Sequence, residues 1–281
     1  MMDRVHFTKG QGTGNDFVIV ADPDGALDLT AEQVATLCDR RFGIGADGVL
    51  RVVRSAKDPA AAGFAADAEW FMDYRNADGS IAEMCGNGVR VFTRYLVANG
   101  LATPGPAGLP VATRAGVVVA VLDGDQIRVR MTAPRVYAAS TATAGPLTFP
   151  GLAVDCGNPH LVCALHDGVE LSALDLTIAP GFDRQLFSAG VNVEFVVPAD
   201  PIDGIDRHVA MRVHERGSGE TLSCGSGALA VGAVALRDAG LATGTVAVEV
   251  PGGRLTVLHD EDDQWWLAGP AVLVAVGETL A

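Results

Sequence analysis

Residues 215–229, Glu-Arg-Gly-Ser-Gly-Glu-Thr-Leu-Ser-Cys-Gly-Ser-Gly-Ala-Leu, place Cys224 between a flexible glycine- and serine-rich run and an apolar, alanine-rich segment. That segment, residues 228–236, has the composition of a buried helix with strong intrinsic helix propensity. Cys224 is therefore expected at the N-terminus of the helix, where backbone N–H groups and the helix dipole favour an anion. A cysteine placed there tends to have a lowered pKa and to react as the thiolate. The simpler alternative is a buried structural cysteine beside a glycine turn.

A second copy of this motif stands earlier in the chain. Residues 76–92 read Asn-Ala-Asp-Gly-Ser-Ile-Ala-Glu-Met-Cys-Gly-Asn-Gly-Val-Arg-Val-Phe and contain another Cys-Gly-x-Gly at Cys85. Asn76 stands as far before Cys85 as Glu215 stands before Cys224, and a helix-like apolar run follows each cysteine. Because two merely structural cysteines have no reason to recur in matched contexts, the repeat favours functional thiols.

A pair of asparagine motifs extends the repeat upstream. Gly14-Asn15-Asp16-Phe17 precedes Cys85, and Gly157-Asn158-Pro159-His160 precedes Cys224, by nearly the same number of residues. Internal self-similarity of this kind predicts that the chain consists of two versions of one structural unit.

Strand signals outnumber helix signals in both halves of the chain. We expect an α/β (α+β) fold of two pseudo-symmetric domains, each a mostly antiparallel or mixed sheet wrapped around one central helix. The expected halves are residues 1–130 and 131–269, with a last strand at about 270–281 that pairs back onto the first half. Residues 138–150, which are small and polar, predict a loop or linker. The active site is expected in the cleft between the domains, with the two cysteine loops facing across it.

Length, charge and cysteine usage narrow the class of protein. A chain of 281 residues is long enough for two domains with cores of their own. The net charge of −14, with no basic stretch, argues against nucleic acid and anionic membrane as partners. Five widely spaced cysteines fit a reducing cytosol better than a disulfide framework, and none has zinc-ligand spacing. No run has the length of a signal peptide or a membrane span, so we expect a cytoplasmic protein.

A glycine-rich loop near the N-terminus resembles a phosphate-binding loop. Gly10, Gly12 and Gly14 alternate with other residues, but they lack the dinucleotide-binding spacing and no helix signal follows them. The chain has only two lysines, Lys9 and Lys57, so candidates for a pyridoxal phosphate Schiff base are few. We therefore expect no cofactor.

Two cysteines in matched halves suggest a particular reaction. One thiolate takes a proton from one face of a carbon while the opposing thiol gives a proton to the other face, which inverts a stereocentre. Such a reaction needs one base and one acid whose pKa values are pushed apart by their surroundings. The carbanion formed between the two steps needs stabilisation, and the backbone amides that follow Cys85 and Cys224 are placed to hold a carboxylate as its charge grows.

The chain resembles the diaminopimelate epimerase family, which comprises cofactor-independent enzymes of lysine and peptidoglycan-precursor biosynthesis. The motifs around Asn15, Asn76 with Cys85, Asn158, and Glu215 with Cys224 carry this resemblance, occur in the family's order and span essentially the whole chain. The resemblance implies interconversion of LL- and meso-diaminopimelate by a thiolate and a thiol.

The resemblance also implies roles for individual residues. Cys85 and Cys224 would be the acid–base pair, and His160 and Glu215 would support catalysis near them. One substrate-binding group would hold the reacting carboxylate and amine, and a second would read the distal amino-acid end, where a carboxylate suits the ammonium and an arginine fork suits the carboxylate. The first group is Asn15, Gly86, Asn87, Gly225 and Ser226, and the second is Asn76, Asn158, Asn192, Glu215 and Arg216.

Two positions depart from the family's pattern. Some members carry a substrate-contacting glutamine where this chain has Gly48, and some use a tyrosine near the C-terminus at a dimer contact, which residues 272–281 lack. The homodimer is therefore expected from the resemblance and not from the residues.

Three other functions compete with this hypothesis. A proline or hydroxyproline racemase also uses paired cysteines, but its second motif typically presents an aspartate and a proline, whereas Glu215-Arg216 suits a longer, doubly zwitterionic substrate. A redox protein with a Cys85–Cys224 disulfide would leave the substrate-reading residues without a purpose. A binding module without catalysis would not need two thiols.

Overall fold

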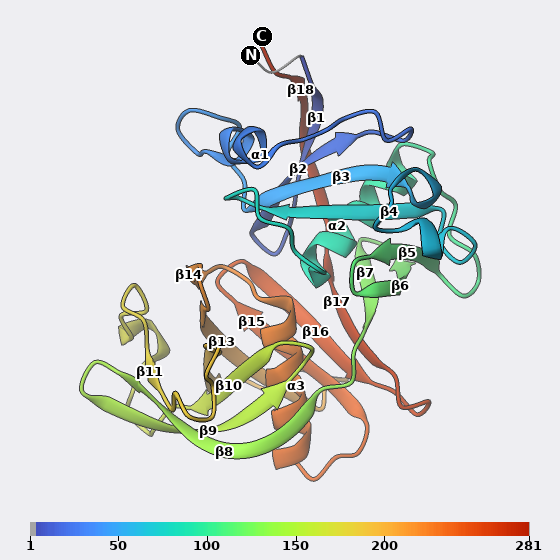
Figure 1. Ribbon diagram of the computed structural model, residues 1–281. Coiled ribbons are helices and arrows are strands. Elements are labelled where there is room, and N and C mark those ends of the chain that lie inside the picture. Colours follow the sequence, from blue (N-terminus) through green and yellow to red (C-terminus); the bar gives the residue numbers. More distant parts are fainter. Residues whose placement is uncertain (1–3, 281) are drawn as a thin grey trace. The chain divides into compact units, whose positions relative to one another are not determined.

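The computed structural model describes residues 4–280 of the chain. They divide into two compact units, the first made of residues 4–129 and 269–280 and the second of residues 130–268. Figure 1 shows the two units as ribbons. The chain enters the second unit once and returns to the first for its last strand.

The first unit is a mixed sheet of eight neighbouring strands in the order β18-β1-β2-β3-β4-β5-β6-β7. Strand β2 is parallel to β3 and β4 is parallel to β5, while the other neighbours are antiparallel. Two short 3-10 helices, η1 (Ser55–Lys57) and η2 (Ala62–Phe64), lie between β3 and β4. The strands are β1 (His6–Gly12), β2 (Asn15–Ala21), β3 (Gly48–Arg54), β4 (Trp70–Asn76), β5 (Leu109–Thr113), β6 (Gly116–Asp123), β7 (Gln126–Met131) and β18 (Val272–Glu278).

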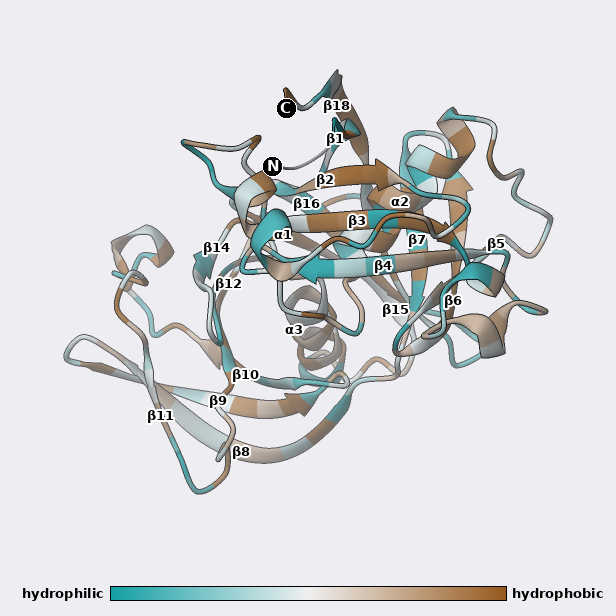
Figure 2. Cartoon of the chain, turned by 45° about the horizontal axis from the view of Figure 1, so that its top comes forward, coloured by the Kyte–Doolittle hydropathy of each residue, from teal (hydrophilic) through white to brown (hydrophobic). Residues whose placement is uncertain are grey.

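Strands β2 and β3 form the apolar centre of this sheet, as their brown colour in Figure 2 shows. Strand β2 runs through consecutive apolar residues from Phe17 to Ala21, and β3 is apolar from Val49 to Val53 except for the buried Arg51, the pattern of strands covered on both faces. Helix α1 (Ala31–Cys38) packs against β3 and begins at a capping box of Thr30 and Gln33. Helix α2 (Gly86–Ala98) contacts most strands of the unit and is its central helix.

The second unit repeats this design. Its strands follow the order β11-β8-β9-β10-β12-β13-β15-β16-β17, with β14 added beside β13. Helix α3 (Gly225–Asp238) contacts strands across the unit, and a 3-10 helix, η3 (Leu171–Ala173), lies between β10 and β12. The strands are β8 (Arg135–Ala144), β9 (Leu147–Asp155), β10 (Pro159–Ala164), β11 (Gly181–Phe182), β12 (Asn192–Pro198), β13 (Arg207–Glu215), β14 (Gly219–Thr221), β15 (Gly244–Val250), β16 (Gly253–His259) and β17 (Trp265–Pro270).

The internal repeat read from the sequence is present in the strand topology. In unit 1 the parallel pair β4 and β5 is joined through α2, and in unit 2 the parallel pair β13 and β15 is joined through α3. The preceding parallel pairs, β2 with β3 and β10 with β12, also correspond. Each half therefore places one cysteine between an antiparallel strand pair and the central helix.

Two expectations about connecting segments need comment. Residues 138–150 are not a linker, because they form most of the β8–β9 hairpin, which turns at Gly145 with φ of 57°. Their alanines and threonines alternate between half-buried and exposed positions, so small side chains concealed a strand pattern. The last strand does pair back, since β18 runs antiparallel to β1 from His6–Glu278 to Gln11–Val272.

Candidate active site

Cys85 is the N-cap residue of α2. Its backbone is extended, with φ of −143° and ψ of 116°, and its sulfur accepts a hydrogen bond from the backbone N–H of Gly88 at 3.3 Å. This is the position that a serine or aspartate oxygen usually occupies at a helix start. The same sulfur lies 3.5 Å from Oδ1 of Asn15 at the start of β2. Cys85 as a residue is half-buried.

A chain of side-chain amides surrounds Cys85. Asn87, in the first turn of α2, donates from Nδ2 to Oδ1 of Asn15 at 3.3 Å, and Asn15 donates from its own Nδ2 to Asp47 at 2.7 Å. Gly86 and Asn87 are buried, with Asn87 only 1 % exposed. The structure thus brings together the four unit 1 residues expected nearest the reaction, and adds Asp47.

Arg90 lies one turn further along α2 and is completely buried. It donates to Oδ1 of Asn87 at 2.8 Å, to Oγ1 of Thr13 at 3.2 Å and to the carbonyl oxygen of Pro270 at 3.4 Å. Burial lowers the pKa of the guanidinium to about 10, so it is charged at neutral pH. A Cβ on Gly12 would come within 3.1 Å of its Nη2, which explains one glycine of the N-terminal run without a phosphate.

The side chain of Asn76 has a different hydrogen-bond partner from the residues around Cys85. It ends β4, and its side chain donates to Oγ of Ser80 at 3.0 Å in the turn that follows the strand. Gly48, where some family members carry a glutamine, faces the same strand: a Cβ there would lie 2.4 Å from the carbonyl oxygen of Arg75 and 2.7 Å from the ring of Tyr74. This packing leaves no room for a side chain at position 48.

Cys224 occupies the corresponding position in unit 2 as the N-cap of α3, with φ of −115° and ψ of 113°. Its sulfur accepts from the backbone N–H of Gly227 at 3.4 Å and lies 3.7 Å from the hydroxyl of Ser226. Gly225, the first residue of α3, is buried. The two cysteines therefore have the same local geometry, as the repeated motif predicted.

The surroundings of Cys224 nevertheless overturn one expectation. We expected a lowered pKa, but burial raises the pKa of this thiol well above its ordinary value, and the carboxylates of Glu215 and Glu194 raise it further. The hydrogen bonds with the backbone N–H of Gly227 and with the side chain of Ser226 lower the pKa, but they do not cancel this shift. Cys224 is thus a protonated thiol in this environment.

His160 is a buried strand residue rather than a loop histidine. It lies in β10 at 0 % exposure, and its Nδ1 is 2.7 Å from Oε1 of Glu194, which is also fully buried. Its Nε2 lies 3.1 Å from Oδ1 of Asn158. Burial raises the pKa of Glu194, and Oε2 of this residue has no hydrogen-bond partner among residues 4–280. A Cβ on Gly227 would lie 2.7 Å from Glu194 Oε1 and 3.3 Å from Cys224 Sγ, so the carboxyl group sits directly beside the first turn of α3.

The remaining unit 2 residues meet at the ends of β12 and β13. Asn192 begins β12, pairs with His160 in the β10–β12 register, and accepts from the backbone N–H of Arg216 at 2.9 Å. Glu215 ends β13 and accepts a short hydrogen bond from Thr221. Arg216 donates from Nη1 to the carbonyl oxygen of Ala189 at 2.9 Å. Unit 2 therefore gathers all of its expected site residues around the start of α3 and the adjoining strand ends.

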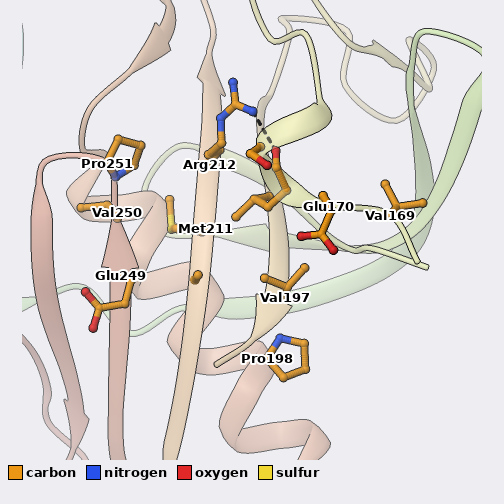
Figure 3. Close-up of a pocket in the computed structure, with 12 residues that line it drawn as sticks. Val169, Glu170, Val197, Pro198, Met211, Arg212, Glu249, Val250 and Pro251 are labelled. Atoms are coloured by element: carbon orange, nitrogen blue, oxygen red, sulfur yellow. Dashed lines mark hydrogen bonds between the residues drawn. The ribbon is translucent and has the colours of Figure 1, made fainter. Parts of the chain in front are cut away.

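A surface pocket elsewhere in unit 2, shown in Figure 3, does not coincide with this cluster. It has a volume of about 600 Å³ and an apolar floor that includes Val197 and Met211. Its arginine, Arg212, is occupied by Glu220 at 2.7 Å and by two backbone carbonyl groups, and its Glu249 is paired with His208 at 2.9 Å. Arg212 and Glu249 are thus satisfied internally, and none of the expected site residues lines this pocket.

Within residues 4–280, no group of three or more histidine, cysteine, aspartate or glutamate side chains is placed to hold a metal ion. No helix of that same range is long and apolar enough to cross a membrane.

Comparison with known proteins identifies the family. The sequence matches the family model described as diaminopimelate epimerase over residues 7–137 and 152–277. The chain belongs to the diaminopimelate epimerase family. It is 52 % identical over 287 aligned positions to the diaminopimelate epimerase of Streptomyces coelicolor, with 99 % of this chain and 96 % of that protein covered. To the diaminopimelate epimerase of Corynebacterium glutamicum it is 50 % identical, with 98 % of each chain covered.

Solved structures extend the likeness to the fold. A hydroxyproline epimerase of Agrobacterium vitis with bound trans-4-hydroxy-L-proline superposes with a TM-score of 0.66 at 17 % identity, covering 99 % of this chain and 91 % of that one. At this identity the likeness shows the fold alone. The expected α+β fold of two pseudo-symmetric domains is thereby confirmed.

Sequence reasoning missed three residues of the site: Arg90, Glu194 and Asp47. Glu194 stands two residues after Asn192 in the same strand, so strand periodicity puts both side chains on one face. Arg90 is a charged residue between two valines, Val89 and Val91, in a helix whose apolar residues predict burial. Asp47 carried no signal, because only tertiary contact brings it to Asn15.

Proposed function

We propose that this chain interconverts LL-2,6-diaminopimelate and meso-diaminopimelate by inverting one α-carbon. As a member of its family the chain is an epimerase, an isomerase that needs no pyridoxal phosphate. The observation that carries the proposal is the matched pair of cysteines, each capping a central helix and each accepting a backbone N–H from the helix's first turn. Neither a binding module nor a one-nucleophile enzyme requires this duplication.

In the proposed mechanism Cys85 and Cys224 form the acid–base pair. The thiolate form of one cysteine removes the α-proton, the electron pair stays on the substrate as a carbanion, and the thiol of the other cysteine donates its proton to the opposite face. The inverted product leaves with the protonation states of the two sulfurs exchanged, and the reverse reaction uses them in the other order. The raised pKa of Cys224 supports its role as the acid in one direction.

The carbanion needs positive partial charges near the substrate's carboxylate. The N–H groups at the first turns of α2 and α3, beginning at Gly86 and Gly225, supply them without reorganisation, because the helices are already formed. Asn15, Asn87 and Ser226 are proposed to hold the carboxylate and amine of the reacting centre. Their hydrogen bonds to one another or to the cysteines support this grouping.

The distal amino-acid group of the substrate is assigned to a second set of residues. Glu215 is proposed to bind the distal ammonium and Arg216 the distal carboxylate, and amide groups complete the set through Asn76, Asn158 and Asn192. The contacts of Asn192 with Arg216 and of Asn158 with His160 support this assignment for unit 2. His160 and Glu215 are proposed to assist Cys224 by hydrogen bonding and charge. We further propose that the enzyme works in the cytoplasm as a homodimer.

The test is incubation of fully reduced protein with LL-diaminopimelate in D₂O. Mass spectrometry follows deuterium at the α-carbon, and chiral separation follows the isomers. We expect deuterium to appear together with the meso isomer, and neither to appear with Cys85→Ala or Cys224→Ala. If the reduced wild-type protein exchanges no α-proton, the substrate assignment is wrong, and proline and hydroxyproline become the substrates to try.

A further inference from the structure

Arg90 is a buried cation without a buried counter-ion among its contacts. Its side chain is 0 % exposed, and its three hydrogen-bond acceptors, from Asn87, Thr13 and Pro270, are all neutral oxygens. No carboxylate of residues 4–280 forms an ion pair with it. Arg51, the other deeply buried arginine of this unit, differs in this respect, because it pairs with three aspartates at 2.7 to 3.2 Å.

A buried charge with only neutral partners lowers the stability of the folded state. Removing an ion from water costs several kcal/mol even after relaxation, and hydrogen bonds to neutral groups recover only part of it. The electrostatic energy of such a site falls when an anion forms nearby. Cys85, the N-cap of the same helix, is the ionisable group whose negative charge acts on Arg90.

The internal repeat supplies a comparison within the molecule. Arg90 stands five residues after Cys85, and the residue five positions after Cys224 is Leu229, which is also 0 % exposed. One central helix therefore buries a cation where its counterpart buries an apolar side chain. Around Cys224 the acting groups have the opposite sign, because the half-buried Glu215 and the fully buried Glu194 both raise the pKa of that thiol.

We propose that Arg90 is a positioning residue whose buried charge makes Cys85 the thiolate of the resting enzyme while Cys224 stays a thiol. The inference deepens the proposed function by assigning the two protonation states of the acid–base pair. Arg90 does not touch the sulfur. It acts through its field, and it also fixes the Asn87 amide, whose Oδ1 must face an arginine because a guanidinium has only donors.

The other charged groups joined to this region form a balanced set. Asn15 donates a hydrogen bond to Asp47, and Asp47 forms an ion pair with Arg40 at 2.8 Å. Asp16 forms ion pairs with Arg40 at 2.7 Å and with Lys9 at 2.6 Å. Two cations and two carboxylates on the strands and loop beside α2 contribute little net field at Cys85. Among the buried residues of α2, Arg90 is the one that carries a charge.

The experiment measures the alkylation of each cysteine by iodoacetamide as a function of pH, with the modified peptides quantified by mass spectrometry. Midpoints are compared rather than rates, because Cys85 is more exposed than Cys224. The variants are Arg90→Met, which removes the charge, Arg90→Lys, which keeps it, and Arg94→Met. Arg94 is the matched control, since it lies on the same helix and bonds outward to the carbonyl oxygens of Gly124 and Asp125.

We expect the Cys85 midpoint of the wild type to lie below that of Cys224. Arg90→Met should raise the Cys85 midpoint by at least about one pH unit and leave that of Cys224 unchanged, while Arg90→Lys should shift it less. Arg94→Met should shift neither, because solvent screens its charge. A folded Arg90→Met protein with an unchanged Cys85 midpoint overturns the proposal.

If Arg90→Met yields no folded protein, the wild type and Arg90→Lys carry the test. A wild-type Cys224 midpoint at or below that of Cys85 contradicts the assignment of the thiolate to Cys85. None of these readouts requires turnover. A chain with the expected midpoints that exchanges no α-proton of diaminopimelate would therefore refute the proposed function and leave the role of Arg90 standing.

Discussion

Replacing Gly227 by alanine tests whether the first turn of α3 is fitted to the groups around Cys224. A Cβ at position 227 would lie 2.7 Å from Oε1 of Glu194, 3.2 Å from Cβ of Cys224 and 3.3 Å from its sulfur. Glu194 cannot simply swing away, because it is fully buried and its Oε1 lies 2.7 Å from His160. The added methyl group must therefore displace the carboxyl group, the histidine or the helix start.

The stability and activity effects differ in size. Overpacking a buried site costs about 1–3 kcal/mol, and alanine returns about 1 kcal/mol of helix propensity. We expect a net loss of about 0–2 kcal/mol in the free energy of unfolding from these two terms. Activity should suffer more, because a displacement of about 1 Å at a catalytic group can cost about a hundredfold in rate.

The repeat provides the matched control, Gly88→Ala at the corresponding position of α2. There the added Cβ would meet Cβ of Cys85 at 3.3 Å and a methyl group of Leu50 at 3.4 Å, so little has to move. Alpha-proton exchange of diaminopimelate in D₂O and urea unfolding are measured for both variants. We expect Gly88→Ala to keep activity within about tenfold of the wild type, and Gly227→Ala to fall well below it.

A second substitution identifies the clash. Shortening Glu194 to aspartate withdraws the carboxyl group from position 227, so Gly227→Ala combined with Glu194→Asp should be less impaired than the two single losses together predict. Contacting residues typically couple by about 0.5–3 kcal/mol. Equal activity of Gly227→Ala and Gly88→Ala, or strict additivity in this cycle, would refute the argument from packing.

Three further outcomes are expected from other contacts. Asp73→Asn should lower the free energy of unfolding by about 3–5 kcal/mol in urea titrations at pH 7, because it deprives Arg75 and Arg114 of the buried carboxylate that they pair with. Burial alone would raise the pKa of Asp73, but the hydrogen bonds from arginines hold it below its ordinary value. The stability that this group contributes is present above its unfolded pKa and is lost as the pH falls through the folded one, so the difference between wild type and variant should shrink in acid below about pH 3.8. Gly232→Ala should lower the melting temperature of the protein despite the better helix propensity of alanine, because its Cβ would lie 2.6 Å from a methyl group of Val257. Gly63→Ala is the control and should leave the melting temperature unchanged, because its Cβ would have no atom within 4 Å. Thr30→Ala should cost about 1 kcal/mol in the same urea titrations by removing a capping box, and no loss would mean that α1 is held by packing alone.

The positions of the two cysteines were predictable because local chemistry determines them. In each motif the cysteine is followed by a Gly-x-Gly sequence and then by an apolar helix. This pattern places the cysteine at the N-cap, and both Cys85 and Cys224 are found there. The repeat strengthened this prediction, since the same pattern occurs twice. The family resemblance then assigned a chemistry to positions that the pattern had already located.

The unpredicted parts depend on tertiary packing. The raised pKa of Cys224 arises from complete burial and from Glu194, neither of which the motif contains. The β8–β9 hairpin was missed because alanine and threonine alternate too weakly in hydrophobicity to indicate a strand, although their register within the sheet is continuous apart from one bulge. Gly48 illustrates the converse, since a departure from the family pattern is explained only by the ring of Tyr74 and the backbone of Arg75 packed against it.

A reaction with two bases sets a requirement that a duplicated scaffold does not meet by itself. Two identical halves would give their cysteines the same pKa. Neither cysteine would then be the preferred thiolate, and the enzyme would populate both thiolate–thiol arrangements equally. The differences between the halves lie where this symmetry has to be broken: a buried arginine follows one cysteine, and a buried leucine takes its place after the other, which instead has two carboxyl groups beside it. Backbone geometry, which is similar in the two halves, positions each sulfur at a helix start. In the proposed mechanism the charges near the two cysteines, which differ between the halves, separate their pKa values. On this proposal the repeat accounts for the matched placement of the two thiols, and the departures from the repeat account for their different protonation states.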